Sequence, residues 1–143
     1  MKENFVLPKF PLERSMGERE WGTETLLHLC PDHWSMKRLE IKKGCKGGLQ
    51  YHRLKDEATF VISGSLIVRY VKNNTIIEEI FDAGSSIHFP PGCIHQEEAI
   101  SDCILLEVST PHANDRVRVD EQYGMKTSGL PSTSLEDIFK IVS

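Results

Sequence analysis

Short runs of apolar and alternating residues, separated by glycine, proline and asparagine, extend along most of the chain. Runs of this length at near-regular spacing, each bounded by turn residues, are typical of antiparallel sandwiches and barrels. The sequence therefore predicts an all-β fold. The predicted strands are 21–29, 34–41, 49–52, 58–63, 66–71, 75–81, 86–89 and 103–109.

One turn and the two ends of the chain have patterns of their own. Asn73-Asn74 is predicted to form a two-residue hairpin turn, because asparagine tolerates positive φ. Residues 1–20 are predicted to be an extended N-terminal arm, since prolines at 8 and 11 block a helix. Residues 21–125 form the predicted barrel. Residues 126–143 are a linker and a short C-terminal helix, which begins with the capping pattern Ser-x-x-Asp and places four apolar side chains on one face.

Composition limits the function classes. At 143 residues the chain is predicted to be a single domain. The net charge is −4 and no basic stripe stands out, which argues against a nucleic-acid partner. The apolar runs are too short to span a membrane, and the N-terminus has no apolar signal core, so we expect a cytoplasmic protein. The four cysteines form no CxxC pair and are expected to be reduced thiols.

Two polar pieces of the sequence contain residues suited to binding a metal. Gln50 and His52 are two apart on a predicted strand, so their side chains point to the same face. Glu57 follows a polar turn, and His95 follows a Pro-Pro-Gly corner. An amide, two imidazoles and a carboxylate form a plausible mixed shell for one divalent metal. Gln50, His52, Glu57 and His95 are therefore the predicted metal ligands.

The spacing of these pieces resembles a known pair of motifs. They read Gly48-x-Gln50-x-His52-x4-Glu57-x6-Gly64 and Gly84-x5-Pro90-x-Gly92-x2-His95. This pattern resembles the paired motifs of the cupin superfamily, with glutamine in place of the usual first histidine. The resemblance implies a double-stranded β-helix (jelly-roll) barrel with a metal in its mouth, and by habit of that fold a homodimer.

A narrower resemblance accounts for the glutamine. The stretch Leu49-Gln50-Tyr51-His52-Arg53 and the run from Asp115 to Gly124 are similar to the type II mannose-6-phosphate isomerase domain. The chain departs from that family at Leu54 and Met125. The resemblance implies a Gln, His, Glu, His shell for zinc, with manganese, nickel and iron as alternatives.

The chemistry expected of such a shell is isomerisation of a sugar. A metal held by neutral ligands and one carboxylate polarises a sugar carbonyl and hydroxyl, and a nearby base moves a proton between carbons. Lys37, Lys55 and His88 are the predicted catalytic groups. His88 lies between Ile87 and Phe89, so it lines the pocket only if those two do not belong to the core.

Two arginines are predicted to bind the substrate, Arg53 as an electrostatic partner and Arg118 because the planar guanidinium fork suits phosphate oxygens. The expected function is an aldose–ketose isomerase of a phosphorylated or nucleotide-linked sugar. Two alternatives stay open at this point: a non-catalytic sugar-binding cupin, and a metal-dependent dioxygenase, since one barrel fold hosts many chemistries.

Overall fold

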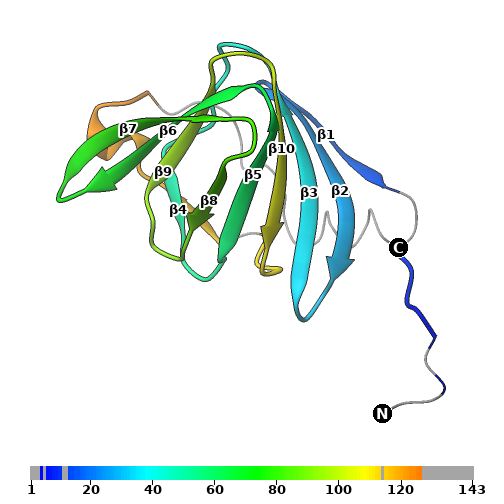
Figure 1. Ribbon diagram of the computed structural model, residues 1–143. Coiled ribbons are helices and arrows are strands. Elements are labelled where there is room, and N and C mark those ends of the chain that lie inside the picture. Colours follow the sequence, from blue (N-terminus) through cyan, green and yellow to red (C-terminus); the bar gives the residue numbers. More distant parts are fainter. Residues whose placement is uncertain (1–3, 5, 11–12, 114, 127–143) are drawn as a thin grey trace.

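Two antiparallel sheets face each other in the computed structural model, which describes residues 4, 6–10, 13–113 and 115–126 (Figure 1). The larger sheet has the strand order β1 (Arg14–Arg19), β2 (Gly22–Cys30), β3 (Trp34–Ile41), β10 (Cys103–Ser109), β5 (Glu57–Ser63) and β8 (Ser86–Phe89). The smaller sheet has the order β11 (Arg116–Arg118), β4 (Gln50–His52), β9 (His95–Ala99), β6 (Ser65–Lys72) and β7 (Thr75–Asp82). The prediction of an all-β jelly-roll fold is confirmed.

The core lies between the two sheets. Val61 and Leu105 of the larger sheet and Leu66 of the smaller sheet are completely buried, and Val68 is 1% exposed. These residues alternate with outward-facing ones along their strands, because successive side chains of a strand point to opposite faces. Full burial of one such side chain contributes about 1.5–3 kcal/mol. This packing closes one part of the space between the sheets and leaves the remainder as a polar cavity.

The predicted hairpin turn is confirmed. Asn73 and Asn74 have φ values of 51° and 59°, and they join β6 to β7 in an antiparallel ladder that runs from Lys72–Thr75 to Ser65–Asp82. Positive φ at both central residues gives a turn whose twist matches that of the flanking strands. All four cysteines are free.

Three strands were not predicted. β1 forms from residues assigned to the N-terminal arm and pairs antiparallel with β2, so only the part before it remains an arm (Figure 1). In that part Leu7 is 70% exposed, whereas Phe10 packs against Met16 and its buried neighbours. β9 and β11 are the other two. The predicted C-terminal helix and most of the linker lie outside the described residues.

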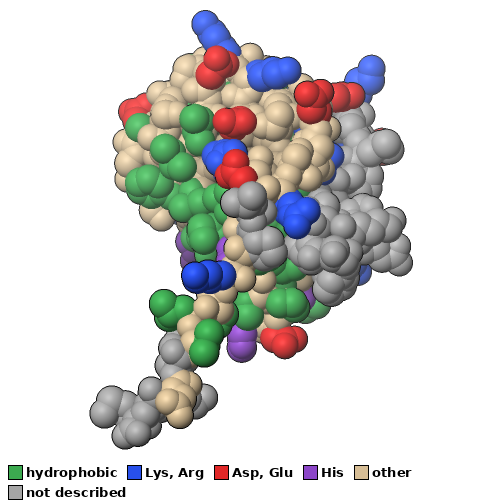
Figure 2. All heavy atoms as spheres, turned by 90° about the vertical axis from the view of Figure 1, so that its right-hand side faces the viewer, with side chains coloured by type: hydrophobic (Ala, Val, Ile, Leu, Met, Phe, Trp, Pro, Cys, Tyr) green, Lys and Arg blue, Asp and Glu red, His purple; other side chains and the backbone are tan. Residues whose placement is uncertain are grey.

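The outward-facing side of the larger sheet is unusually apolar. Trp34, Phe60, Ile62 and Val108 are each between 43% and 47% exposed there, and we call these four the apolar outer face. Phe60 is paired with Leu106, and Val108 lies between Ala58 and Met36, so the apolar surface is continuous across three strands. Figure 2 shows hydrophobic side chains gathered on the side of the molecule where this sheet lies. In the part of the chain that the structure describes, no helix is long and apolar enough to cross a membrane.

Candidate functional site

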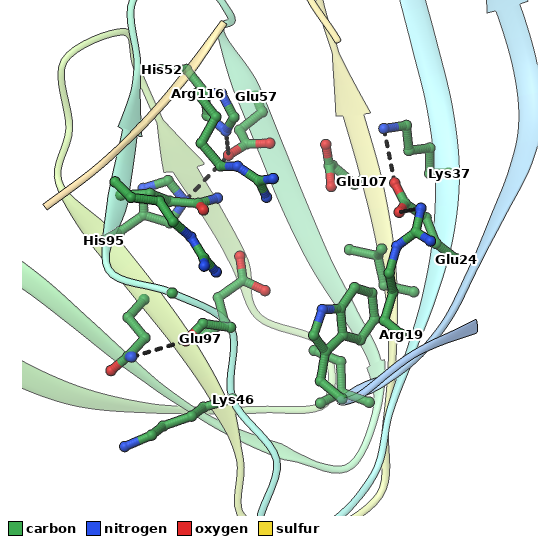
Figure 3. A pocket seen from close by; sticks show the side chains of 18 of the residues that line it. Arg19, Glu24, Lys37, Lys46, His52, Glu57, His95, Glu97, Glu107 and Arg116 are labelled. Atoms are coloured by element: carbon green, nitrogen blue, oxygen red, sulfur yellow. Dashed lines mark hydrogen bonds and ion pairs between the residues drawn. The ribbon is translucent and has the colours of Figure 1, made fainter. Parts of the chain in front are cut away.

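A cavity of about 750 Å³ opens between the two sheets. Its lining is rich in charged groups, and residues from both sheets point into it (Figure 3). All four predicted metal ligands line this cavity, together with Lys37, Lys55 and Arg118. The structure therefore brings seven of the nine predicted site residues to one place.

The smaller sheet arranges three of the predicted ligands through its register. Gln50 on β4 is paired directly with His95 on β9. His52 lies two residues beyond Gln50 on β4, so the alternation of side chains places it on the same face of the sheet. The fourth ligand, Glu57, is the first residue of β5 in the opposite sheet and is buried. The set thus spans the cavity from one sheet to the other.

The two imidazoles converge on one carboxylate oxygen. Nε2 of His52 lies 3.6 Å from Oε1 of Glu57, and Nε2 of His95 lies 3.3 Å from the same oxygen. These separations are long for hydrogen bonds. Two ligands of a tetrahedral ion with bonds of about 2.0–2.2 Å are held about 3.3–3.5 Å apart. Each of these two separations is therefore close to that of a pair of ligands on one metal ion.

Each imidazole is oriented by its other nitrogen. Nδ1 of His52 is 2.9 Å from Oδ1 of Asp115, and Nδ1 of His95 is 3.0 Å from the carbonyl oxygen of Cys93. A carbonyl only accepts hydrogen bonds, so Nδ1 of His95 carries the proton. Hydrogen bonds of this kind fix the ring orientation of histidines that bind metals. Both Nε2 atoms are consequently directed at Glu57.

The fourth donor, Gln50, also fits a metal. Its side-chain oxygen is buried and has no hydrogen-bond partner among the described residues. Burying an unpaired oxygen costs folding free energy unless a bound ion or molecule interacts with its lone pair. In the described residues no group of three or more His, Cys, Asp and Glu side chains is by itself arranged as a metal site. The proposed shell therefore includes the amide of Gln50 beside the two imidazoles and the carboxylate.

The protonation of the two histidines differs. Burial and the nearby Lys55 ammonium lower the pKa of His52. Burial acts in the same direction on His95, but its hydrogen bond to Cys93 and the carboxylate of Glu57 outweigh it and raise the pKa of His95 to about 10. His95 and Glu57 are thus a charged pair, and a bound metal ion would take the place of the proton on Nε2 of His95.

Lys55 forms ion pairs with two neighbouring carboxylates. Its ammonium is buried and lies 2.9 Å from Glu57 and 2.5 Å from Glu107. Burial alone would lower the pKa of Lys55, but the two carboxylates raise it far above its usual value. An amine held in its charged form accepts no proton, so Lys55 neutralises the carboxylates beside the ligand set.

Lys37 belongs to a second buried charge pair in the same cavity. Its ammonium lies 3.0 Å from Oε1 of Glu24, whose other oxygen is 3.3 Å from Arg19. Burial acts to raise the pKa of Glu24, but Lys37 and Arg19 outweigh it and lower the pKa below its ordinary value of 4.5. Lys37 therefore faces the cavity as part of a fixed ion pair (Figure 3).

Two predicted residues lie elsewhere. Phe89 is buried in the core, so the alternation along β8 turns His88 outward. Its side chain is 64% exposed and pairs with Asp56 at 2.6 Å, which removes it from the possible bases of the cavity. Arg53 is exposed and does not line the cavity, because the turn after β4 carries it to the surface. The structure therefore does not bring His88 and Arg53 to the cavity with the other seven residues.

Sequence reasoning missed several residues that line or support the cavity. Asp115 orients His52, and Glu24 and Glu107 pair with the two lysines. Glu97 lies two residues beyond His95 on β9 and points into the cavity (Figure 3). Its carboxylate has no hydrogen-bond or ion-pair partner among the described residues, and burial raises its pKa to about 7. For Glu97 the available signal was its position two residues beyond the predicted ligand His95, which places both on one face of a strand.

Comparison with known families identifies the fold family of the chain. The model of the cupin domain matches residues 37–109, which is just over half of the chain. The chain is a cupin. No curated protein sequence matches it.

Several solved structures share the fold of this cupin. CapF, a capsular polysaccharide assembling protein from Staphylococcus aureus, aligns with a TM-score of 0.63 at 22% identity over 72% of this chain and 33% of its own. KdgF from Halomonas sp. aligns with a TM-score of 0.57 at 16% identity over 65% of this chain and 81% of its own. A mutant of oxalate decarboxylase from Bacillus subtilis aligns with a TM-score of 0.66 at 16% identity over 85% and 36%. This cupin spans about a third of the length of the CapF structures.

Proposed function

We propose that this cupin is a metal-dependent aldose–ketose isomerase of a phosphorylated or nucleotide-linked sugar, similar to mannose-6-phosphate isomerase. One observation carries the proposal. Two imidazoles, each anchored through Nδ1, direct Nε2 at one oxygen of Glu57, and the unsatisfied amide oxygen of Gln50 lines the same cavity. This donor set fits zinc, with manganese, nickel and iron as alternatives.

His52, His95, Glu57 and Gln50 would hold the ion. When bound, it supplies a Lewis acid that polarises the carbonyl and hydroxyl oxygens of the sugar. Isomerisation breaks the C–H bond beside the carbonyl, and the electrons of that bond become the C=C bond of an enediol. The π electrons of the carbonyl move onto its oxygen, which takes the proton of the neighbouring hydroxyl. The proton removed from carbon then returns to the former carbonyl carbon. The protein must therefore supply one group that takes and returns a proton.

Glu97 is the group that suits this task best by position. Its carboxylate lines the cavity and has no partner among the described residues. Lys37 and Lys55 are each paired with buried carboxylates, so we assign them to charge balance and orientation. An uncommitted carboxylate within reach of the substrate is a suitable general base.

The substrate class rests on the positive charge of one cavity wall. Arg118 and Arg116 line the cavity on β11, and guanidinium groups suit phosphate oxygens. A carbohydrate substrate is also compatible with the alignment to CapF, a capsular polysaccharide assembling protein.

The test is exchange of the sugar's C–H proton with D₂O. We expect zinc-loaded protein to incorporate deuterium while converting an aldose phosphate to its ketose, and chelation to abolish both. Glu97→Gln should lower the rate by about 10²–10⁴-fold while leaving the zinc content unchanged. If the protein contained its full zinc and bound the sugar but exchanged no C–H proton, it would be a sugar-binding protein and not an isomerase. Oxygen consumption by the iron form would point to a dioxygenase.

We further propose a homodimer formed through the apolar outer face. Trp34, Phe60, Ile62 and Val108 are exposed on strands of one sheet, and contiguous exposed apolar patches mark interaction surfaces. A second copy packed there would remove this surface from water without covering the cavity, because these side chains point away from it.

A further inference from the structure

A single glycine beside the ligand set lies directly against an arginine. A Cβ added to Gly48 would lie 2.5, 2.6 and 2.7 Å from Nη2, Nε and Cζ of Arg118. Such separations are well inside van der Waals contact. The φ of Gly48 is outside the left-handed region, so its backbone conformation does not require glycine. Glycine is needed at this position for space, and the space is filled by the guanidinium of Arg118.

The backbone around Gly48 is fixed on both sides. Leu49 donates its N–H to Oδ1 of Asp120 at 2.9 Å and accepts a hydrogen bond from the N–H of Val119 at 2.9 Å. Gln96 donates a side-chain N–H to the carbonyl of Gly47 at 2.9 Å. A side chain at position 48 could not be accommodated by moving this segment without breaking these bonds. Arg118 would have to move instead.

A second arginine stands beside the first. Arg118 is paired with Gln50 and Arg116 with His52 in the β11–β4 ladder. Residues two apart on a strand share a face, so both arginines stand next to predicted metal ligands. Both line the cavity, and Arg116 extends into it (Figure 3).

We propose that Arg116 and Arg118 form a subsite beside the predicted metal ligands, and that this subsite binds an oxyanion group of the substrate. Gly48, which has no side chain, provides the backbone surface against which Arg118 packs. The shared chemistry is a phosphate or carboxylate group, which guanidinium forks bind through paired N–H donors. This inference rests on the proposed function only in taking the cavity as the ligand site. It adds that one small molecule would place its anionic group at the two arginines and its other oxygens at the metal-ligand set, on the same wall of the cavity.

The test is calorimetric titration of the folded full-length protein. The probes are inorganic phosphate, an aldose phosphate, the matching sugar acid and the neutral sugar. Chelated protein is titrated alongside the zinc form, so that binding to the arginines is separated from binding to the metal. We expect phosphate or the sugar acid to bind the chelated protein, and the tighter of the two to identify the anion.

Two matched substitutions make the test specific. Gly48→Ala should weaken oxyanion binding about tenfold or more, the loss expected when charge-assisted hydrogen bonds are displaced. Gly47→Ala should bind as wild type does, because an added Cβ at Gly47 meets no atom within 4 Å. If Gly48→Ala does not fold, Arg118→Met and Arg116→Met provide the same comparison. The neutral sugar should bind all variants alike.

Three results would overturn the subsite: no oxyanion binding by wild type, binding that disappears on chelation, or oxyanion binding by the Gly48→Ala and Arg118→Met variants that equals that of wild type. Failure of the isomerase proposal looks different. A protein that binds phosphate through Arg118 but exchanges no C–H proton would contradict isomerisation and leave the oxyanion subsite standing.

Discussion

The carboxylate of Asp115 joins the imidazole of His52 to the turn that follows it. One oxygen lies 2.9 Å from Nδ1 of His52, and the other accepts the backbone N–H groups of Leu54 and Lys55 at 2.6 and 2.7 Å. Burial acts to raise the pKa of Asp115, but these donors lower it. A residue that enters β11 thus fixes the chain between two predicted ligands, His52 and Glu57.

Replacing Asp115 should therefore weaken metal binding without removing a ligand. Loss of such an outer-shell partner typically costs about 10- to 100-fold in metal affinity. We expect Asp115→Ala to lower zinc affinity by this amount in a competition titration with a chromophoric chelator. Asp56→Asn is the control, because Asp56 pairs with His88 on the exposed side of the sheet. Equal zinc affinity of the Asp115 variant and wild type would contradict the role of Asp115.

Removal of the ligands themselves should have a sharper effect. We expect His52→Ala and His95→Ala each to abolish stoichiometric metal retention, since each removes a nitrogen donor directed at Glu57. Elemental analysis of the purified proteins measures this, and circular dichroism checks that the β fold persists. A doubly substituted protein that still retained one metal per chain would show that the ligand assignment is wrong.

The apolar outer face predicts the oligomeric state. A glutamate at Phe60 would place a charge in the centre of the proposed interface, where it would have to be desolvated. Phe60→Glu should convert the dimer to a monomer in light scattering coupled to size exclusion. Ile80→Glu is the matched control, because Ile80 is 65% exposed on β7 of the other sheet. A wild-type protein that is monomeric at all concentrations would contradict this proposal.

The sequence predicted the strands whose inward positions are apolar. Val61, Leu66 and Leu105 belong to strands with a clear alternation or an apolar run, and those strands occur where predicted. β9 was missed because its sequence, His-Gln-Glu-Glu-Ala, has charged groups where a core strand has valine or isoleucine. The cavity explains the difference, since a strand that lines a polar site carries functional groups on its inner face.

The ligand set was predictable for a related reason, whereas its supporting residues were not. Gln50 and His52 are close in sequence, and their shared face follows from the two-residue period alone. Asp115 reaches His52 across 63 residues of sequence, and Gly48 meets Arg118 across 70. Those contacts depend on the pairing of β11 with β4. β11 has only three residues, and its local sequence does not indicate which strand it pairs with.

The buried pair of Glu24 and Lys37 gives stability a defined pH dependence. Their charged atoms lie 3.0 Å apart and both residues are buried. The pKa of Glu24 is lowered in the folded protein relative to 4.5, so the pair stabilises the fold above about pH 4.5. This contribution is lost as the pH falls through the folded-state pKa of Glu24. Removing one partner of a buried pair costs about 3–5 kcal/mol.

Glu24→Gln should therefore lower the free energy of unfolding by about 3 kcal/mol at pH 7, measured by urea denaturation of the metal-free protein. The difference from wild type should shrink as the pH falls below 4.5, because protonation neutralises Glu24 in wild type as well. Glu13→Gln is the control, since Glu13 pairs with Arg38 at 3.0 Å on the surface with its side chain 56% exposed. Its cost should stay below about 1 kcal/mol. A Glu24→Gln deficit that grew on acidification would contradict the lowered pKa of Glu24.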